Sequence, residues 1–135
     1  MLSSFKIGDS YGSAKLDVKS SKLFLDLQSE QKTKIRNNLA IELSKAASID
    51  LGRIKAINNR YQIDQFDGEE QVVLIFSISA TDDPFKPNVN TIMKNLNVLI
   101  KYKSYTPISL YNNTYMLDSE YGFRETSKLE LLFIF

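Results

Sequence analysis

The sequence predicts a single α+β domain in which an antiparallel sheet carries two helices on one face. Two segments repeat apolar residues at three- and four-residue intervals, and shorter segments around them alternate apolar and polar residues as strands do. The 135 residues contain no internal repeat, no low-complexity tract and no linker rich in Pro, Gly or Ser. We therefore expect one domain over residues 1–135.

Short alternating runs predict strands over residues 4–27, beginning with Phe5 and Ile7. The stretch GDSYGS, residues 8–13, supplies turn residues after the first run. We expect residues 1–20 to be an N-terminal extension whose strand is a candidate for exchange with another molecule. The later runs are made by Leu16, Val18, Leu23, Leu25 and Leu27.

A long amphipathic helix is predicted over residues 29–47. Leu39 and Leu43 belong to an apolar series at helical spacing, while Glu42 and other polar residues occupy the remaining faces. Ser29 is a suitable N-cap, because its hydroxyl can accept a hydrogen bond from the backbone of the first turn.

The middle of the chain predicts two strands separated by a polar turn. Residues 54–57 form a short apolar segment, and residues 62–70 (QIDQFDGEE) are polar and turn-like. Residues 71–79 (QVVLIFSIS) are the most apolar run of the chain, with apolar side chains on both sides. This pattern is typical of a central strand that is covered on both faces.

A second amphipathic helix follows, with Asn88 or Asn90 as its N-cap. Pro107 ends that part of the chain, because proline cannot continue a helix. The Tyr-rich residues 108–123 predict an extended excursion or hairpin, and residues 129–135 predict the last strand. The apolar series of this helix comprises Val89, Ile92, Met93, Leu96, Leu99 and Ile100.

This order of elements favours a split βαβ, or ferredoxin-like, arrangement. Two helices separated by a strand pair and flanked by strands give an antiparallel sheet with both helices on one face. The extra N-terminal strands and the C-terminal strand are then additions to that arrangement.

Composition excludes several kinds of site. The chain contains no Cys and no His, which removes disulfides, thiolate nucleophiles, the usual zinc sites and the commonest general base. A net charge of +1 provides no long-range field for nucleic acid. No window approaches the roughly 18 apolar residues of a membrane span, and no signal peptide is visible. No phosphate-binding or dinucleotide motif is present, so we expect neither enzymatic activity nor a cofactor or small-molecule substrate.

Residues 22–79 resemble a SEA-type module. The likeness consists of a strand, a helix ending IELSKAASIDLGRI, a strand, a polar loop with glycine and the run VVLIFSIS. The resemblance implies an extracellular adhesion or binding module. SEA modules that cleave themselves carry Gly-Ser before a valine run, whereas this chain has Gly68-Glu69 there. Without a hydroxyl beside the glycine, self-cleavage by that route is not expected.

The segment IMKNLNVLIKYKSYTPISLYNNTYMLDSEYGF is rich in Asn, Lys and Ile. In this composition the segment is similar to structural proteins of large double-stranded DNA viruses. The resemblance implies a virion component, and together with the SEA likeness it favours an extracellular or virion-surface location.

Four carboxylates, Asp64, Asp67, Glu69 and Glu70, gather in the polar segment before the central strand. Clustered carboxylates are ligands that Ca²⁺ prefers, but the spacing matches no EF-hand loop and charged loops are usually only solvated. We predict no metal site and keep these residues as weak calcium candidates.

Two features stand out in the Tyr-rich segment. Asn112 begins the acceptor pattern Asn-Asn-Thr for N-linked glycan, although a polar turn is the plainer interpretation. Tyr111 and Tyr115 offer large rigid side chains with polar tips, which suit protein interfaces, and the alternative is that such rings cover the sheet.

The apolar C-terminal strand raises the question of what covers it. A bare apolar edge promotes aggregation, so the strand either returns to its own sheet or completes a sheet in another copy by strand addition. We hypothesise a non-enzymatic assembly protein, a homo-oligomeric subunit of a filament, virion or surface layer that contacts copies of itself or another structural protein. The alternative is a monomeric extracellular SEA-like binding module. The predicted interface comprises Phe5, Ile7, Tyr111, Tyr115, Leu129, Leu131, Phe133 and Phe135.

Overall fold

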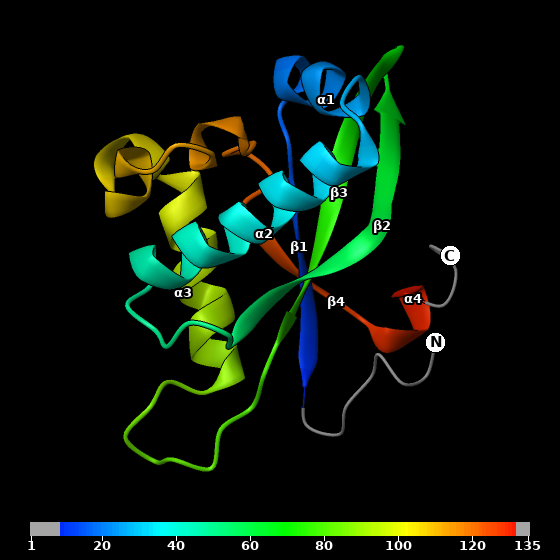
Figure 1. The fold of residues 1–135 in the computed structure, drawn as a ribbon. Coiled ribbons are helices and arrows are strands. Elements are labelled where there is room, and N and C mark those ends of the chain that lie inside the picture. The colour runs from blue at the N-terminus through cyan, green and yellow to red at the C-terminus, as the bar shows by residue number, and fades with distance from the viewer. Residues whose placement is uncertain (1–8, 132–135) are drawn as a thin grey trace.

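The computed structural model describes residues 9–131, without the side chains of residues 58–60 and 128–129. Within that range the chain is an α+β structure with a four-stranded sheet in the order β2-β3-β1-β4, and all neighbouring strands are antiparallel (Figure 1). In chain order the elements are β1 (Ser10–Lys15), α1 (Val18–Leu25), α2 (Ser29–Ala46), β2 (Ile54–Phe66), β3 (Glu69–Ile78), α3 (Val89–Lys101), the 3₁₀ helices η2 (Lys103–Tyr105), η3 (Pro107–Leu110) and η4 (Thr114–Met116), β4 (Phe123–Thr126) and α4 (Lys128–Leu131).

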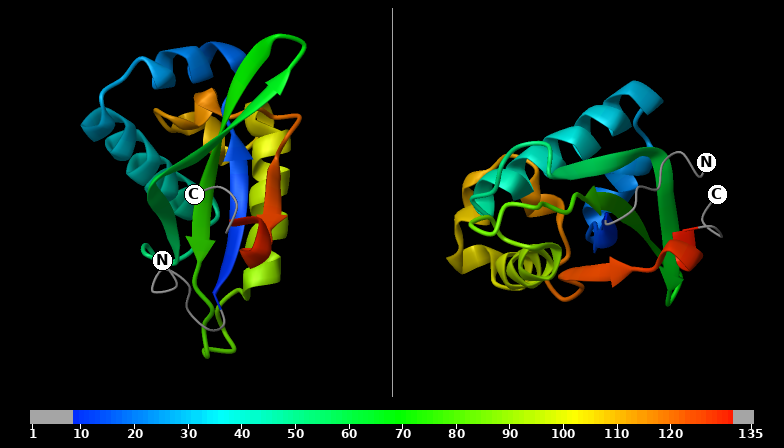
Figure 2. Two further views of the ribbon diagram at one scale, coloured as in Figure 1. Left: turned by 90° about the vertical axis from the view of Figure 1, so that its right-hand side faces the viewer. Right: turned by 90° about the horizontal axis from the view of Figure 1, so that it is seen from below.

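The helices α1, α2 and α3 pack on one face of the sheet, as the sequence predicts for its two long helices (Figure 2). Alternate residues of β3 point into this core, where they meet the apolar stripes of α2 and α3. Burial of these side chains is the main favourable term in the stability of the fold. The largest contributions come from Leu16, Phe24, Leu39, Leu43, Leu74, Phe76, Ile78, Ile92 and Leu96, each no more than 1% exposed.

The central strand is confirmed. β3 lies inside the sheet between β2 and β1, and its residues 72–76 are all buried. Leu74 and Phe76 face the helices, whereas Val73 and Ile75 belong to a second apolar cluster on the opposite face. A continuous apolar run is therefore required, because both faces of this strand are covered along its middle.

Both long helices begin close to where the sequence predicts. The Asn88 side chain caps α3 by accepting a hydrogen bond from the backbone amide of Thr91 at 2.9 Å. In α2 the cap is Gln28 rather than the predicted Ser29, and it forms a capping box with Gln31.

The prediction for the N-terminal region is wrong in two places. Residues 10–15 form the strand β1, although the sequence predicts a turn there, because Gly12 serves close packing and not chain reversal. Residues 18–25 form the helix α1, although the alternating leucines predict a strand. Asp17 caps this helix by accepting from the amide of Ser20 at 2.7 Å, and Phe24 is the side chain that α1 buries in the core.

The polar segment before β3 is a strand and not an extended turn. β2 runs on from the predicted residues 54–57 to Phe66, and the reversal is confined to Asp67 and Gly68. Both turn residues have positive φ, at 54° and 76°, as a type I′ hairpin turn requires. This part of the strand is mostly polar because the side chains of residues 62–66 are exposed on both of its faces.

The C-terminal region differs most from the prediction. Residues 107–116 form short 3₁₀ helices in place of an extended hairpin, and the last strand of the sheet is β4. Leu129 and Leu131, predicted in a strand, lie in the short helix α4, where the amide of Leu131 donates to the carbonyl oxygen of Ser127. Residues 132–135 of that predicted strand, which include Phe133 and Phe135, lie outside the described residues, as do Phe5 and Ile7.

Candidate functional site: the open sheet face and its free edge

The sheet face opposite the three long helices is only partly covered. Tyr11 of β1 and Val73 and Ile75 of β3 are buried there beneath Leu131 of α4, which is itself fully buried. Ile57 and Tyr121 are partly buried against the same cluster.

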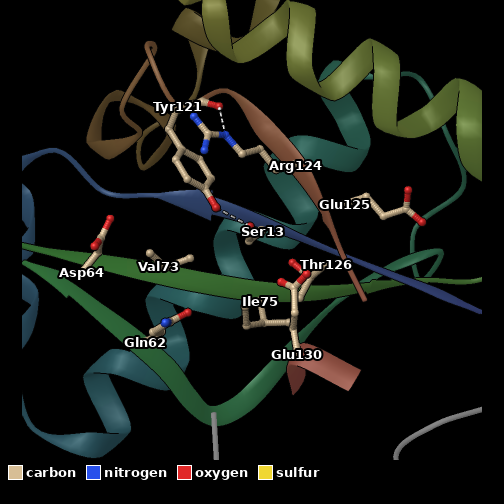
Figure 3. A pocket seen from close by; sticks show the side chains of 10 residues that line it. All are labelled: Ser13, Gln62, Asp64, Val73, Ile75, Tyr121, Arg124, Glu125, Thr126 and Glu130. Carbon is tan, nitrogen blue, oxygen red and sulfur yellow. Dashed lines mark hydrogen bonds between the residues drawn. The ribbon is translucent and has the colours of Figure 1, made fainter. Parts of the chain in front are cut away.

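A cavity of about 320 Å³ lies on this open face (Figure 3). Its floor is made by β1 and β3, and its walls come from β2, β4, α4 and the turn before β4. A neighbouring cavity of about 370 Å³ shares Asp64, Tyr121 and Arg124 with the first. The first cavity is lined by Ser13, Gln62, Asp64, Val73, Ile75, Tyr121, Arg124, Glu125, Thr126 and Glu130.

Tyr121 is the centre of this site. Its hydroxyl is hydrogen-bonded to Ser13 Oγ at 2.7 Å, which fixes the ring above the sheet (Figure 3). The guanidinium of Arg124 lies 4.0 Å from the ring centroid, and its Nε donates to the Tyr121 carbonyl oxygen at 3.2 Å. Lys15 Nζ lies 4.9 Å from the same centroid. Two cations near one aromatic ring give a rigid platform with a polar rim.

Charges in the site are mixed. Lys15 donates to Asp64 Oδ2 at 2.7 Å, and the lysine side chain is 13% exposed. Glu130 adds a further acidic residue to the lining of the first cavity. The only hydroxyl on the β1 side of the cavity floor, that of Ser13, is engaged with the Tyr121 phenol, and the chain supplies no imidazole to activate it. The arrangement is equipped to hold a ligand or partner.

The second part of the site is the free edge of β2. Residues 57–60 bulge, because these four residues lie opposite Ile75 alone between the pairs Ala56–Phe76 and Tyr61–Leu74. Beyond the bulge, residues 61–66 pair regularly with β3, and we call this segment the β2 arm. No other strand pairs with β2 within residues 9–131. Residues 62–66 are exposed, with Ile63 at 43% and Phe66 at 78%.

The four calcium candidates do not converge. Asp64 pairs with Lys15, while Asp67, Glu69 and Glu70 are exposed around the tip of the hairpin. Within residues 9–131 no group of three or more carboxylates is placed to hold a metal ion. The sequence clusters these residues along the chain, but alternation of side chains along two strands separates them in space.

The predicted Tyr-rich interface lies on a different side of the protein from the open face. Tyr115 is 61% exposed, whereas Tyr111 is half-buried and lines a cavity of about 330 Å³ beside α2. Asn112 is exposed in the same loop, while the hydroxyl of Thr114 in the acceptor pattern is buried and donates to the carbonyl oxygen of Ile108. The structure therefore does not bring Tyr111 and Tyr115 together with Leu131.

Glu42 of α2 is hydrogen-bonded to this loop. The sequence predicts only that it lies on a polar face of the helix. Its carboxylate is 9% exposed and accepts from the amide of Asn113 at 2.8 Å, from Asn113 Nδ2 at 2.6 Å and from the amide of Thr114 at 3.1 Å. No periodicity could reveal this role, because the partners lie 71 and 72 residues away.

Sequence reasoning also missed Ser13, Lys15 and Tyr121 as members of one site. Ser13 and Lys15 are two residues apart in β1, and this spacing is the signal that would place them on one face of the strand. The described part of the chain, residues 9–131, includes no helix with the length and apolar character needed to cross a membrane. Comparison with known proteins finds no matching family model, no similar curated protein and no matching solved structure.

Proposed function

We propose that the protein is a non-enzymatic assembly module, a subunit of a filament, virion or surface layer whose contacts are made by strand addition. The free edge of the β2 arm is the observation that carries this proposal. We also propose that the fold is ferredoxin-like, which is supported by the order β2-β3-β1-β4 with one helical segment between β1 and β2 and another between β3 and β4.

A free strand edge presents unpaired amide and carbonyl groups to any extended chain. Natural proteins protect such edges with proline, several charges or a bulge. The β2 arm contains no Pro and no Gly, and its one charged residue, Asp64, is already paired with Lys15. Its bulge lies before the arm and leaves residues 61–66 regular. The arm is therefore a suitable acceptor for a strand from outside the described chain.

The proposed donor is an apolar terminal segment of a neighbouring copy. Phe5 and Ile7, or Phe133 and Phe135, supply the alternating apolar residues that strand addition uses. Leu131 is not part of the donor, because it is buried against its own sheet. In such a contact the donor and acceptor surfaces differ, so each copy can bind the next one. The copies then form an open filament, unless the rotation between neighbouring copies closes a ring.

The test compares two isoleucines of equal exposure. Ile63 on the β2 arm and Ile41 on α2 are both 43% exposed, so lysine at either position should leave the fold intact. We expect the light-scattering mass of the unmodified protein and of Ile41→Lys to rise with concentration above the 15.4 kDa monomer. Ile63→Lys should remain monomeric, because a charge on the edge opposes pairing.

Two results would contradict this proposal. One is a mass of 15.4 kDa for the unmodified protein at every concentration, together with an absence of ordered particles of native material in electron micrographs. The other is unchanged association of Ile63→Lys.

The cavity on the open face favours a second candidate function, a monomeric binding module. A polar cavity of about 320 Å³ with an Arg124–Tyr121 stack is suited to a protein or glycan ligand. The SEA-type resemblance agrees with this alternative and implies an extracellular location. A concentration-independent monomer in the experiment above is the result that favours it.

A further inference from the structure

Arg36 of α2 is the most deeply buried charged side chain of the described residues. It is 2% exposed, and its Nε and Nη1 make no hydrogen bond, while Nη2 donates to Thr33 Oγ1 at 3.2 Å. Arg53, which is 8% exposed, donates from all three of its nitrogens to the carbonyl oxygens of Ser79 and Pro87. The fold thus satisfies one buried guanidinium completely and leaves two nitrogens of the other without an acceptor.

A second cation lies beside Arg36. Lys32 Nζ is 5.8 Å from the centroid of the Phe24 ring and 5.5 Å from that of the Tyr61 ring. The Arg36 guanidinium carbon is 6.0 and 5.9 Å from the same two centroids. The two rings are in edge contact at 5.4 Å, so two like charges share one aromatic pair.

No carboxylate balances these charges within residues 9–131. The ion pairs there are Lys15–Asp64 and Lys86–Asp50, and neither Lys32 nor Arg36 takes part in one. The aromatic faces attract both cations, but a ring face is a poor substitute for the missing hydrogen-bond acceptors of a guanidinium. Desolvation accordingly lowers the pKa of Arg36, and interaction with Tyr61 opposes that shift only in part.

A buried charge without a partner weakens a fold, and an unsatisfied buried polar group commonly marks an absent water or ion. Lys32 and Arg36, in the N-terminal half of α2, lie near the rings of Phe24 from α1 and Tyr61 from the β2 arm. α1, the start of α2 and the β2–β3 hairpin lie at the same end of the molecule (Figure 1). We propose that Lys32 and Arg36 form a binding site for a small oxyanion, either a phosphate or a carboxylate.

An oxyanion supplies what this site lacks. Its oxygens accept hydrogen bonds from Nε and Nη1 of Arg36, and its charge relieves the repulsion between the two cations. The phenol of Tyr61, which accepts from Lys32 Nζ at a long 3.4 Å, is the side chain that moves aside when the anion enters. Tyr61 directly follows the bulge of β2, where the strand register is already interrupted. Tyr61 is also the first residue of the β2 arm, but the proposed ligands of the oxyanion, Lys32 and Arg36, belong to α2 and do not depend on pairing at the strand edge.

Titration with inorganic phosphate, acetate and chloride at equal ionic strength tests the site and separates the two sources of oxyanion. We expect phosphate or acetate, but not chloride, to raise the melting temperature of the protein in a saturable way and to bind in calorimetry. Arg36→Met and Lys32→Gln should each weaken this binding by at least about tenfold, because each removes charge-assisted hydrogen bonds. The matched control is Lys34→Gln, an exposed lysine of the same helix, which should bind as the unmodified protein does.

Ring NMR signals of Tyr61 provide a readout that does not depend on stability, and they should shift with phosphate or acetate only while Lys32 and Arg36 are intact. The proposal is overturned if neither anion has an effect beyond that of chloride on the unmodified protein. It is equally overturned if both variants retain the full effect. Should Arg36→Met fail to fold, Lys32→Gln with the Tyr61 signals decides the question alone.

Discussion

Gly12 shows how one residue permits close packing between neighbouring strands. A Cβ built at this position would lie 2.6 Å from Cζ of Phe123 and 3.2 Å from the carbonyl oxygen of Arg124. The Phe123 ring is 4% exposed and packs against Phe76, with ring centroids 6.3 Å apart, so it has little room to withdraw. Glycine therefore allows the ring of β4 to lie over β1.

Gly12→Ala should lower the free energy of unfolding by about 1–3 kcal/mol, because it overpacks this contact. Chemical denaturation gives the value. The double variant with Phe123→Leu should recover part of the loss, since the smaller side chain leaves room for the new methyl group. Strictly additive losses in the two variants would show that Gly12 and Phe123 do not compete for the same space.

At the same scale, the exposed ion pair between Lys86 Nζ and Asp50 Oδ2, 2.5 Å apart, joins the loop before α3 to the end of α2. The hydrogen bond from Lys86, and then its charge, lower the pKa of the Asp50 carboxyl. The same two interactions raise the pKa of Lys86.

The signs of these shifts define a pH window. A lowered carboxyl pKa stabilises the fold above the ordinary value of about 4, and this contribution is lost as pH falls through the folded-state pKa. A raised lysine pKa stabilises the fold below the ordinary value of about 10.4, and this contribution is lost as pH rises through the folded-state pKa. In Lys86→Gln the Asp50 pKa, measured by carboxyl NMR titration, should rise to its ordinary range. An unchanged Asp50 titration would contradict the assigned cause.

At the scale of elements, β3 carries the core. Leu74 is completely buried on the helix-facing side, in a strand that has neighbours on both edges. Leu74→Ala should therefore reduce stability by about 2–5 kcal/mol through lost contacts and a residual cavity.

Ile63→Ala on the exposed β2 arm is the control for that prediction, and it should change stability by no more than about 0.5 kcal/mol. Both values come from urea denaturation of the purified variants. A loss below about 1 kcal/mol for Leu74→Ala would mean that the strand does not organise the core.

At the scale of the whole molecule, the two sheet faces are built differently. One face is covered by three helices, whereas within the described residues the other has a small apolar cluster of Tyr11, Val73, Ile75 and Leu131, with Ile57 and Tyr121 packed against it. Leu131 is fully buried although it stands almost at the end of the described chain. The short helix α4 thus supplies one of the four buried side chains of the apolar cluster on this face.

Leu131→Ala should cost about 2–3 kcal/mol, near the lower end of the range for leucine, because the cluster around it is small. Hydrogen exchange should increase in β1 and at residues 73–75 more than in α2 or α3. Equal increases throughout the chain would show that α4 supports the whole fold and not this face alone.

The sequence by itself determined α2, α3 and β3, together with their arrangement around a common core. The two helices repeat their apolar residues at the helical period, and β3 is a continuous apolar run typical of a strand covered on both faces. The Asn88 cap of α3 satisfies an amide only three residues away. For the candidate site, the sequence predicts only that Ser13 and Lys15 lie on one face of β1. No local pattern predicts their hydrogen bonds with Tyr121 and Asp64, which are distant in the sequence.

Only the tertiary structure decided the remaining elements. Residues 62–66 form a strand because β3 pairs with them, and β1 tolerates Gly12 because Phe123 arrives there from the far end of the sequence. Glu42 and Arg36 lie in the same amphipathic helix, yet one carboxylate is fully satisfied and one guanidinium is left with two free nitrogens. The physical reason is that periodicity reports only which side of an element faces inward, while partners for buried polar groups and free edges are supplied by segments distant in the chain.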